Sequence, residues 1–376
     1  MGARTRGIAN NILANGLDAT DGLSGAVSSS NIANSSVTSV SSTPSLGGGF
    51  EKVASDPPSP VEGDIWFNTT SNIVKGYVFS ATPASWSTGG TTSRGFRGGG
   101  GFGGSTGAIL FGGSDGEPAP NPNTNVSESY NGTSWTSAPN YPFAHRDSAG
   151  TGTSTAGLGI CGHSSTGSIS TCNEWDGSGW TGTGSHPLPL RANSAFGIQT
   201  AAVNAGGGVG APEAKTAATQ EYNGSTWTTV NSMSTAKQNA ASSGTQTLGL
   251  VAGGSGYPGV PEPTQGNLTE EYDGTSWTNS NNLNNLRNSS VGMTGTQTSS
   301  VIYGGSHPTG ASNATEQYDG TSWTTLPGVN ISNTGASEIQ GNGSTTQATA
   351  FHVNVPGTEE FTEAVSEVQV KTLTSS

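Results

Sequence analysis

The stretch Glu270-Glu-Tyr-Asp-Gly-Thr-Ser-Trp-Thr278 decides the fold, because close versions of it recur along the chain. Asn-Gly and Asp-Gly favour the type I′ turn of a tight hairpin, so each copy predicts a β-hairpin with a two-residue turn. The other copies are Tyr130-Asn-Gly-Thr-Ser-Trp135, Trp175-Asp-Gly-Ser-Gly-Trp180, Tyr222-Asn-Gly-Ser-Thr-Trp227 and Tyr318-Asp-Gly-Thr-Ser-Trp323.

The two aromatic residues of each copy are predicted to share one face of the hairpin. With Asp273-Gly274 as the turn, Tyr272 pairs with Thr275 and Trp277 pairs with Glu270, which places the two rings on one face and diagonal to each other. A lone hairpin is marginal in water, whereas stacked copies bury each large ring for roughly 1.5–3 kcal/mol. The aromatic residues assigned this structural role are Tyr130, Trp135, Trp175, Trp180, Tyr222, Trp227, Tyr272, Trp277, Tyr318 and Trp323.

Composition supports an all-β protein with many short strands. Only 30% of the 376 residues are hydrophobic, and 59 are glycine without a collagen-like period. The formal net charge of −13 argues against general nucleic-acid binding. We find no apolar run long enough for membrane insertion and no secretory signal, so we expect synthesis in a cytoplasm without a signal peptide.

The spacing of the tryptophans predicts a repeat architecture. Intervals of 49, 45, 47, 50 and 46 residues separate Trp86, Trp135, Trp180, Trp227, Trp277 and Trp323. Periods in this range are typical of solenoids and propellers. A small-residue strand (strand A) and an apolar strand ending in glycine (strand B), such as 248–254, precede the two strands of each hairpin (strands C and D), which gives four strands per unit.

The last unit is degenerate, and two segments compete to complete it. Residues 348–353 and 358–361 supply its middle strands, and either the tail 368–374 or the strand with Trp86 supplies the fourth. Both choices close a ring of six four-stranded blades, with seven blades as the alternative. We predict three regions: an extended N-terminal segment over 1–50, with a disordered tail as the alternative; a linker and β-hairpin region over 51–89, with strands at 64–68 and 73–79; and a propeller over 90–376.

These features resemble two known groups of proteins. The recurring Gly-Gly followed by Tyr-(Asn/Asp)-Gly-x-x-Trp resembles the kelch-type β-propeller repeat over about residues 90–374. The segment Gly63-Asp-Ile-Trp-Phe-Asn-Thr-Thr-Ser-Asn72 and the Ser/Asn/Ala-rich N-terminus resemble virion and tail-fibre proteins of tailed bacteriophages, cyanophages in particular. This resemblance implies a virion structural protein, attached to other virion proteins through residues 1–60 and contacting a host receptor or polysaccharide. A homotrimer is implied if the N-terminal segment forms a fibre stalk.

The predicted topology places the long loops on one face, which makes that face the expected contact surface. The B–C and D–A connections are long and lie together, whereas the A–B and C–D turns are short. Five basic residues are predicted to share one repeat position, at the start of strand A. They either form a cationic ring for an anionic partner or each pair with carbonyls and acids of the repeat. These residues are Arg94, Arg146, Arg191, Lys237 and Arg287.

Other candidate residues carry weaker signals. The repeated Glu128, Glu270, Glu316 and Glu359 are expected to accept structural hydrogen bonds, because copies in different blades do not form the carboxylate pair of a glycosidase. Tyr141, Phe143 and Tyr257 are candidates for stacking on sugars from the long loops.

We predict no metal site and no cofactor, since no pair of histidines has metal-ligand spacing on a shared element. Cys161 and Cys172 are predicted to be either two buried free thiols or a bridge between successive strands. Three functions compete. A host-surface adhesin leads, a purely structural connector or decoration protein is the second, and an enzyme, either a depolymerase or a kelch-type copper oxidase, is the third.

Overall fold

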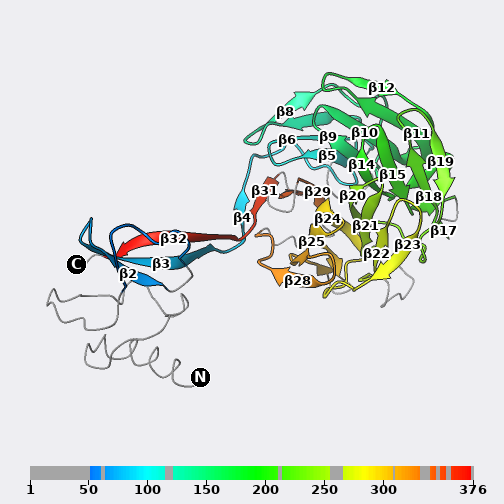
Figure 1. Ribbon diagram of the computed structural model, residues 1–376. Coiled ribbons are helices and arrows are strands. Elements are labelled where there is room, and N and C mark those ends of the chain that lie inside the picture. The colour runs from blue at the N-terminus through cyan, green and yellow to red at the C-terminus, as the bar shows by residue number, and fades with distance from the viewer. Residues whose placement is uncertain are drawn as a thin grey trace. The chain divides into compact units, whose positions relative to one another are not determined.

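The computed structural model describes residues 51–60, 64–114, 122–210, 214–254, 266–307, 310–330, 339–343, 348–352 and 357–373, so the segment expected over 1–50 lies outside the described residues. All regular structure in these ranges is β, as predicted, and they contain no helix that could cross a membrane. The chain forms two compact units, one from Met1–Pro83 with Ala364–Ser376 and the other from Ala84–Glu363 (Figure 1).

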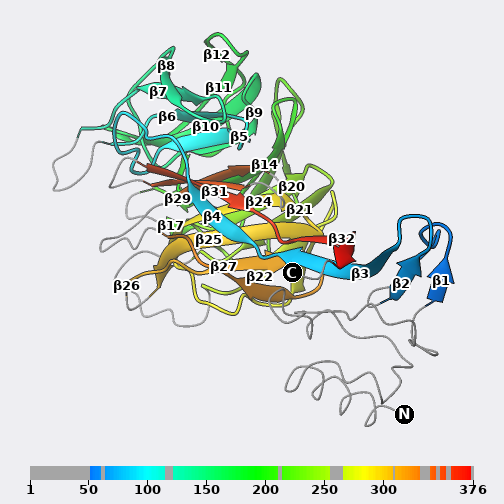
Figure 2. The same cartoon turned by 90° about the vertical axis from the view of Figure 1, so that its left-hand side faces the viewer.

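The larger unit is a series of antiparallel sheets, in each of which the chain meanders through four strands (Figures 1 and 2). The first strand of each sheet lies beside the first strand of the next, which gives a propeller-like arrangement. The first three sheets are β5 (Gly100–Gly104), β6 (Gly107–Phe111), β7 (Ser127–Tyr130) and β8 (Trp135–Ala138); β9 (Ala149–Thr153), β10 (Ala156–Ser164), β11 (Gly167–Trp175) and β12 (Trp180–Gly182); and β14 (Ser194–Ile198), β15 (Ala201–Ala205), β18 (Thr219–Tyr222) and β19 (Trp227–Val230).

The next two sheets keep the same order, and short strands extend some sheets at the loop-rich end. The strands β13 (Leu190–Arg191), β16 (Gly208–Val209) and β17 (Ala214–Lys215) continue the sheet of β9 to β12, and β26 (Gly310–Ala311) pairs with β25. The two sheets are β20 (Ala241–Thr245), β21 (Leu248–Ala252), β22 (Thr269–Tyr272) and β23 (Trp277–Ser280); and β24 (Ser289–Thr296), β25 (Ser299–His307), β27 (Thr315–Tyr318) and β28 (Trp323–Leu326).

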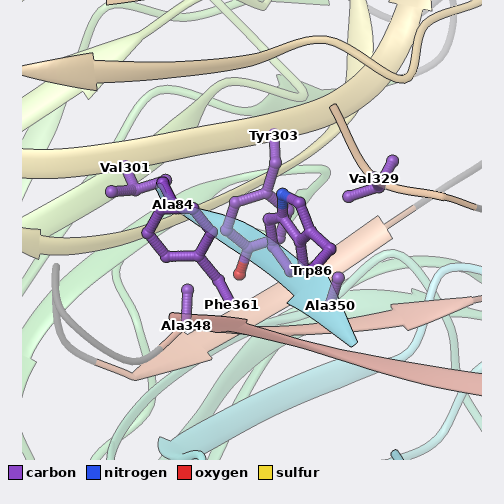
Figure 3. Close-up of a cluster of buried hydrophobic side chains, with 8 residues drawn as sticks. All are labelled: Ala84, Trp86, Val301, Tyr303, Val329, Ala348, Ala350 and Phe361. Carbon is purple, nitrogen blue, oxygen red and sulfur yellow. The ribbon is translucent and has the colours of Figure 1, made fainter. Parts of the chain in front are cut away.

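Two distant parts of the sequence build the last sheet. It consists of β29 (Ile339–Gly343), β30 (Ala348–His352), β31 (Gly357–Thr362) and β4 (Ser85–Thr88), with Trp86 opposite Phe361. The strand that holds Trp86 therefore completes the last unit, and the C-terminal tail does not. Figure 3 shows the rings of Trp86, Phe361 and Tyr303 in one cluster; the centroid of the Trp86 ring lies 5.2 Å from that of Phe361 and 4.9 Å from that of Tyr303.

The hairpin that defines the repeat forms, but its predicted register is wrong. Tyr272 pairs directly with Trp277, so the loop holds four residues and the rings face each other with centroids 4.9 Å apart. The carboxylate of Asp273 explains the longer loop, since its Oδ1 accepts the amides of Thr275 at 2.8 Å and Ser276 at 2.7 Å. Within the loop, Gly274 alone adopts a positive φ, of 87°, whereas a type I′ turn requires two such residues.

The hydrophobic core lies between neighbouring sheets. In one cluster, Leu250 of one sheet contacts Ile302, Tyr318 and Trp323 of the next, and the other clusters repeat this plan. The tyrosine of each hairpin is at most 1% exposed, a burial that four short strands could not provide alone.

Polar side chains tie each sheet to the one before it. The hydroxyl of Tyr222 donates to Glu174 at 2.7 Å, and that of Tyr272 donates to Glu221 at 2.9 Å. The indole N–H groups reach threonine hydroxyls in the same direction, as Trp277 does to Thr219 at 3.0 Å. These bonds satisfy the polar ends of rings whose apolar bodies are buried.

The smaller unit is a separate four-stranded sheet. Its strands are β1 (Glu51–Val53), β2 (Ile65–Asn68), β3 (Ile73–Thr82) and β32 (Val365–Leu373), in that order. The predicted hairpin is confirmed as β2 and β3, while the predicted linker contributes β1, which runs parallel to β2. Asp56 accepts bonds from Trp66, Asn68 and Lys75, and these donors lower the pKa of its carboxyl to about 2.

The inter-sheet packing yields a first prediction. Trp323→Ala removes a ring that is 6% exposed together with its hydrogen bond to Thr269, so the free energy of unfolding should fall by about 3–5 kcal/mol. Denaturant titration of the full chain measures this change. Thr324→Ala, at the exposed neighbouring position, should change it by less than about 0.5 kcal/mol, and equal effects of both variants would contradict the role of the indole.

Candidate binding surface

The four repeated glutamates are buried and serve the structure of their own sheets. Glu128, Glu270, Glu316 and Glu359 are each at most 2% exposed. Each accepts backbone amides from the D–A loop that leads into its sheet, for example the Ser234 amide on Glu270 at 2.7 Å. Three other backbone amides do the same: Ser93 on Glu128, Asn284 on Glu316 and Asn330 on Glu359. The carboxylates thus replace water for loop amides that the fold buries.

Two of the five candidate cations are buried against these glutamates. Lys237 is 1% exposed with its Nζ 3.2 Å from Glu270, and Arg287 is fully buried with its Nη2 2.9 Å from Glu316. Arg287 also donates to the carbonyls of Gly304 and Ala314. Burial lowers the pKa of both cations, and the partner carboxylate opposes that shift. Neither side chain is available at the surface.

The five cations do not share one repeat position, contrary to the prediction. The carbonyls of Lys237 and Arg287 accept the amides of Gly207 and Gly254, so these two cations are equivalent to each other and to His145, whose carbonyl accepts the Gly113 amide. Arg146 and Arg191 come one residue later in the repeat. The D–A loops differ in length, so the sequence does not show this offset of one residue. The offset decides whether a side chain points into the interior or lies at the rim.

Arg94 occupies a third position. Its guanidinium donates to the Gly112 carbonyl at 3.0 Å and lies 4.4 Å over the Phe96 ring. Gly112 is the equivalent of Gly304, which accepts from Arg287, so Arg94 fills the same interior place from an earlier point in its loop. Arg94 is therefore a half-buried structural cation.

Three half-buried arginines do share one position, which we call the arginine arc: Arg97, Arg146 and Arg191. Each pairs through its backbone with the residue that begins a B–C connection, namely Ser114, His163 and Gly208. They precede the inner strands β5, β9 and β14, so they lie on three successive sheets at the loop-rich face. The sequence analysis named two of them and missed Arg97, which only the backbone register identifies.

The surroundings of the arc are polar. Asp147 lies 3.5 Å from Arg146, and Lys215 pairs with Gly208, the strand neighbour of Arg191. His163 is partly buried, and burial together with the nearby Arg191 and Arg146 lowers its pKa. Additional positive charge therefore disfavours protonation of this imidazole, so arginine and lysine carry the positive charge of the site.

The residues that follow the arc arginines, namely Gly98, Asp147 and Ala192, line a cavity of about 210 Å³ among the inner strands. Small residues of β5, β9, β14, β20 and β24 line it, and the hydroxyl of Ser148 and the Oδ1 of Asn193 are buried there without a protein partner. A series of backbone hydrogen bonds links the sheets at its rim. The Asp147 amide donates to the Gly98 carbonyl, the Ala192 amide to the Asp147 carbonyl, and the Asn239 amide to the Ala192 carbonyl. All four of these residues have left-handed φ, between 52° and 66°.

The aromatic candidates for sugar stacking fare differently. Tyr141 is buried, contrary to expectation: its ring stacks on Phe111 at 5.1 Å, and its hydroxyl accepts a bond from Asn173 at 2.8 Å. Burial raises its pKa. Phe143 is half-buried against Tyr141, and Tyr257 lies outside the described residues. The position of Tyr141 in a predicted loop did not indicate that its ring packs between two sheets.

The described residues contain no group of three or more His, Cys, Asp or Glu side chains placed to hold a metal ion. Cys161 and Cys172 are both buried and free, as one of the two sequence hypotheses proposed.

Comparison with known proteins supports the fold. No family model and no curated protein matches the chain. Among solved structures, that of YjhT is similar, with a TM-score of 0.56 and 10% sequence identity over 75% of this chain and 99% of that chain. At this identity the similarity concerns the fold alone, an all-β architecture of repeated four-stranded sheets.

The buried ion pair yields a second prediction. Arg287→Met leaves the Glu316 carboxylate charged and buried, so the free energy of unfolding should fall by about 3–5 kcal/mol. Adding Glu316→Gln removes the charge and keeps an oxygen for the Asn284 amide, and this double variant should recover most of the loss in denaturant titration. A double variant less stable than Arg287→Met would contradict this reasoning.

His145 yields a prediction about pH. Burial lowers its pKa from 6.5 to about 4, so between these values the unfolded chain binds a proton that the folded chain does not. Its contribution is fully present above pH 6.5 and is lost as the pH falls toward 4, by roughly 3 kcal/mol in total.

The matched variant is His145→Leu. Leu190 precedes Arg191 just as His145 precedes Arg146, so leucine already occupies this repeat position in the next unit. Between pH 7 and pH 5 the native protein should lose roughly 2 kcal/mol more than this variant. Thermal unfolding at several pH values measures the difference, and parallel curves for the two proteins would contradict a neutral buried imidazole.

Proposed function

We propose that the larger unit is a closed six-bladed propeller that acts as a non-catalytic binding module. Closure is supported by the last sheet, whose inner strand β29 lies beside both β24 and β5. The Trp135 indole donates to Thr358 across this junction at 2.9 Å, which repeats the bond between Trp277 and Thr219 elsewhere. The kelch-like motifs of the sequence favour the same architecture.

The partner that we propose is an anionic surface polymer bound by the arginine arc. The observation that carries this proposal is the placement of Arg97, Arg146 and Arg191 at one structural position on successive sheets. Seven Lys and Arg residues occur within Ala84–Glu363, of which Arg94, Lys237 and Arg287 serve the interior, while the arc and Lys215 lie at the loop-rich face. Guanidinium groups bind carboxylate and sulfate oxygens in bidentate geometry and steer anions toward this face.

A binding role accounts for the carboxylates better than a hydrolytic role. A glycosidase needs two carboxylates roughly 5–10 Å apart and free to exchange protons. Here the repeated glutamates belong to different sheets and are each occupied by loop amides. We therefore propose no enzymatic step.

The setting that we propose is the particle of a tailed bacteriophage. The resemblance of residues 63–72 and of the N-terminus to virion proteins supports this setting, with residues 1–60 contacting other virion proteins and the propeller contacting host polysaccharide or a receptor. A connector that binds only virion proteins is the second candidate, favoured by the same N-terminal resemblance. Particle imaging with an antibody against the larger unit separates an outward-facing module from a buried spacer.

Polymer binding tests the proposed partner. The full chain should bind immobilised alginate or dextran sulfate and not neutral dextran, with affinity that falls as salt rises. The variant Arg97→Gln/Arg146→Gln/Arg191→Gln should bind at least about tenfold more weakly, which corresponds to a loss of only 1.4 kcal/mol, without a change in unfolding temperature.

The control changes charge on the opposite face. Asp176→Asn/Asp273→Asn/Asp319→Asn alters three hairpin loops in which other copies already have Asn131 and Asn223, so folding should be kept. This variant should bind at least as well as the native protein. Equal binding by the arc variant, or no binding by the native protein to either anionic polymer, would overturn the proposal.

A further inference from the structure

The sheet of β9 to β12 departs from the repeat at two positions, and a cysteine occupies each. The first is Cys161, which stands where four of the other sheets have the first glycine of a Gly-Gly pair. Cys161 has a left-handed φ of 57°, a conformation that disfavours any residue with a Cβ. The glycines at the equivalent place have φ between 67° and 70°: Gly112, Gly206, Gly253 and Gly304.

The second departure is Cys172, which stands where four of the other sheets have a threonine and the first sheet has Ser127. That threonine accepts the indole N–H of the next sheet, as Thr219 does from Trp277 and Thr269 from Trp323. The Trp227 indole meets the sulfur of Cys172 instead, without a well-formed hydrogen bond. Cys161 thus replaces a glycine that tolerates a left-handed φ, and Cys172 replaces a threonine that accepts an indole N–H.

The strand register brings the two thiols together. Ile160 pairs with Cys172, and regular pairing resumes only at Gly162 with Ile169, so Cys161 lies inside an irregularity beside Cys172. Both side chains are fully buried in one cluster, where the thiols donate to the backbone carbonyls of Leu188 and Ser170, each at 3.8 Å. Two unfavourable substitutions that meet in space point to a role for the pair.

We propose that Cys161 and Cys172 form a disulfide that crosslinks β10 and β11 once the protein meets an oxidising environment. In thiol–disulfide exchange with a small disulfide such as oxidised glutathione, one cysteine thiolate attacks and releases one small thiol. The second cysteine then attacks the mixed disulfide and releases the other. Two cysteine thiols are oxidised and one small disulfide is reduced to two thiols, which take up the two protons.

Burial determines when the bond forms. Both sulfurs are shielded in the folded protein, so exchange requires folding in the presence of oxidant or a local opening of the sheet. Once closed, the bond is shielded from reducing agents by the same packing.

Mass spectrometry tests the proposal. The full chain is refolded with oxidised and reduced glutathione, then unfolded in guanidinium chloride at about pH 8 with excess iodoacetamide, which alkylates thiolates, and digested. We expect no alkylation, one linked peptide that contains both cysteines, and an unfolding temperature at least about 2 °C above that of the sample kept in reducing agent. Alkylation of both cysteines, or glutathione on either of them, would overturn the proposal.

The matched variants restore what the other sheets have. Cys161→Gly and Cys172→Thr should each fold, carry one alkylated thiol, and show the same unfolding temperature with and without oxidant. A temperature shift that persists in these variants would contradict a crosslink as its cause. The peptide map of the native protein decides the question independently of how the variants fold.

Discussion

The structure depends on one constraint: a single four-stranded sheet cannot bury its own aromatic rings. Each hairpin places a tyrosine directly opposite a tryptophan, or a tryptophan opposite another, on one face of a narrow sheet, and that sheet has no second layer of its own. The next sheet supplies the cover, and its glutamate and threonine accept the polar ends of the rings. Because every sheet both requires and provides this cover, stability is shared along the series and no sheet has an independent core.

The repeat was readable from the sequence because its aromatic and glycine positions follow from local rules. Alternation and turn composition were sufficient to predict four strands per unit, their order, and the hairpin of β2 and β3. The hairpin register was not predicted, because the Asp273 side chain replaces a backbone contact in the loop, and propensity for Asp-Gly alone does not distinguish the two turns.

The candidate site was less predictable, for a geometric reason. Lys237 and Arg191 look alike in the sequence, each a cation shortly before an inner strand, yet one faces a buried glutamate and the other the rim. A single residue of offset decides between these outcomes, and the irregular D–A loops conceal it. Interior positions also vary in concert: where Glu270 gives way to Asn173, the position of Lys237 holds His145, and the hydroxyl of Tyr141 accepts a bond from the Asn173 amide.

The last sheet joins β4, near residue 86, to β31, near residue 360. During translation Trp86 is synthesised long before β31, whose Phe361 packs against it, so its indole has no partner from β31 while the intervening sheets are made. The last sheet therefore forms only after β31 has been synthesised, and the contact between Trp86 and Phe361 joins residues that are far apart in the sequence. A nascent chain that ends before β31 lacks the strand that pairs with β4, so an indole and an unpaired sheet edge are left open to aggregation.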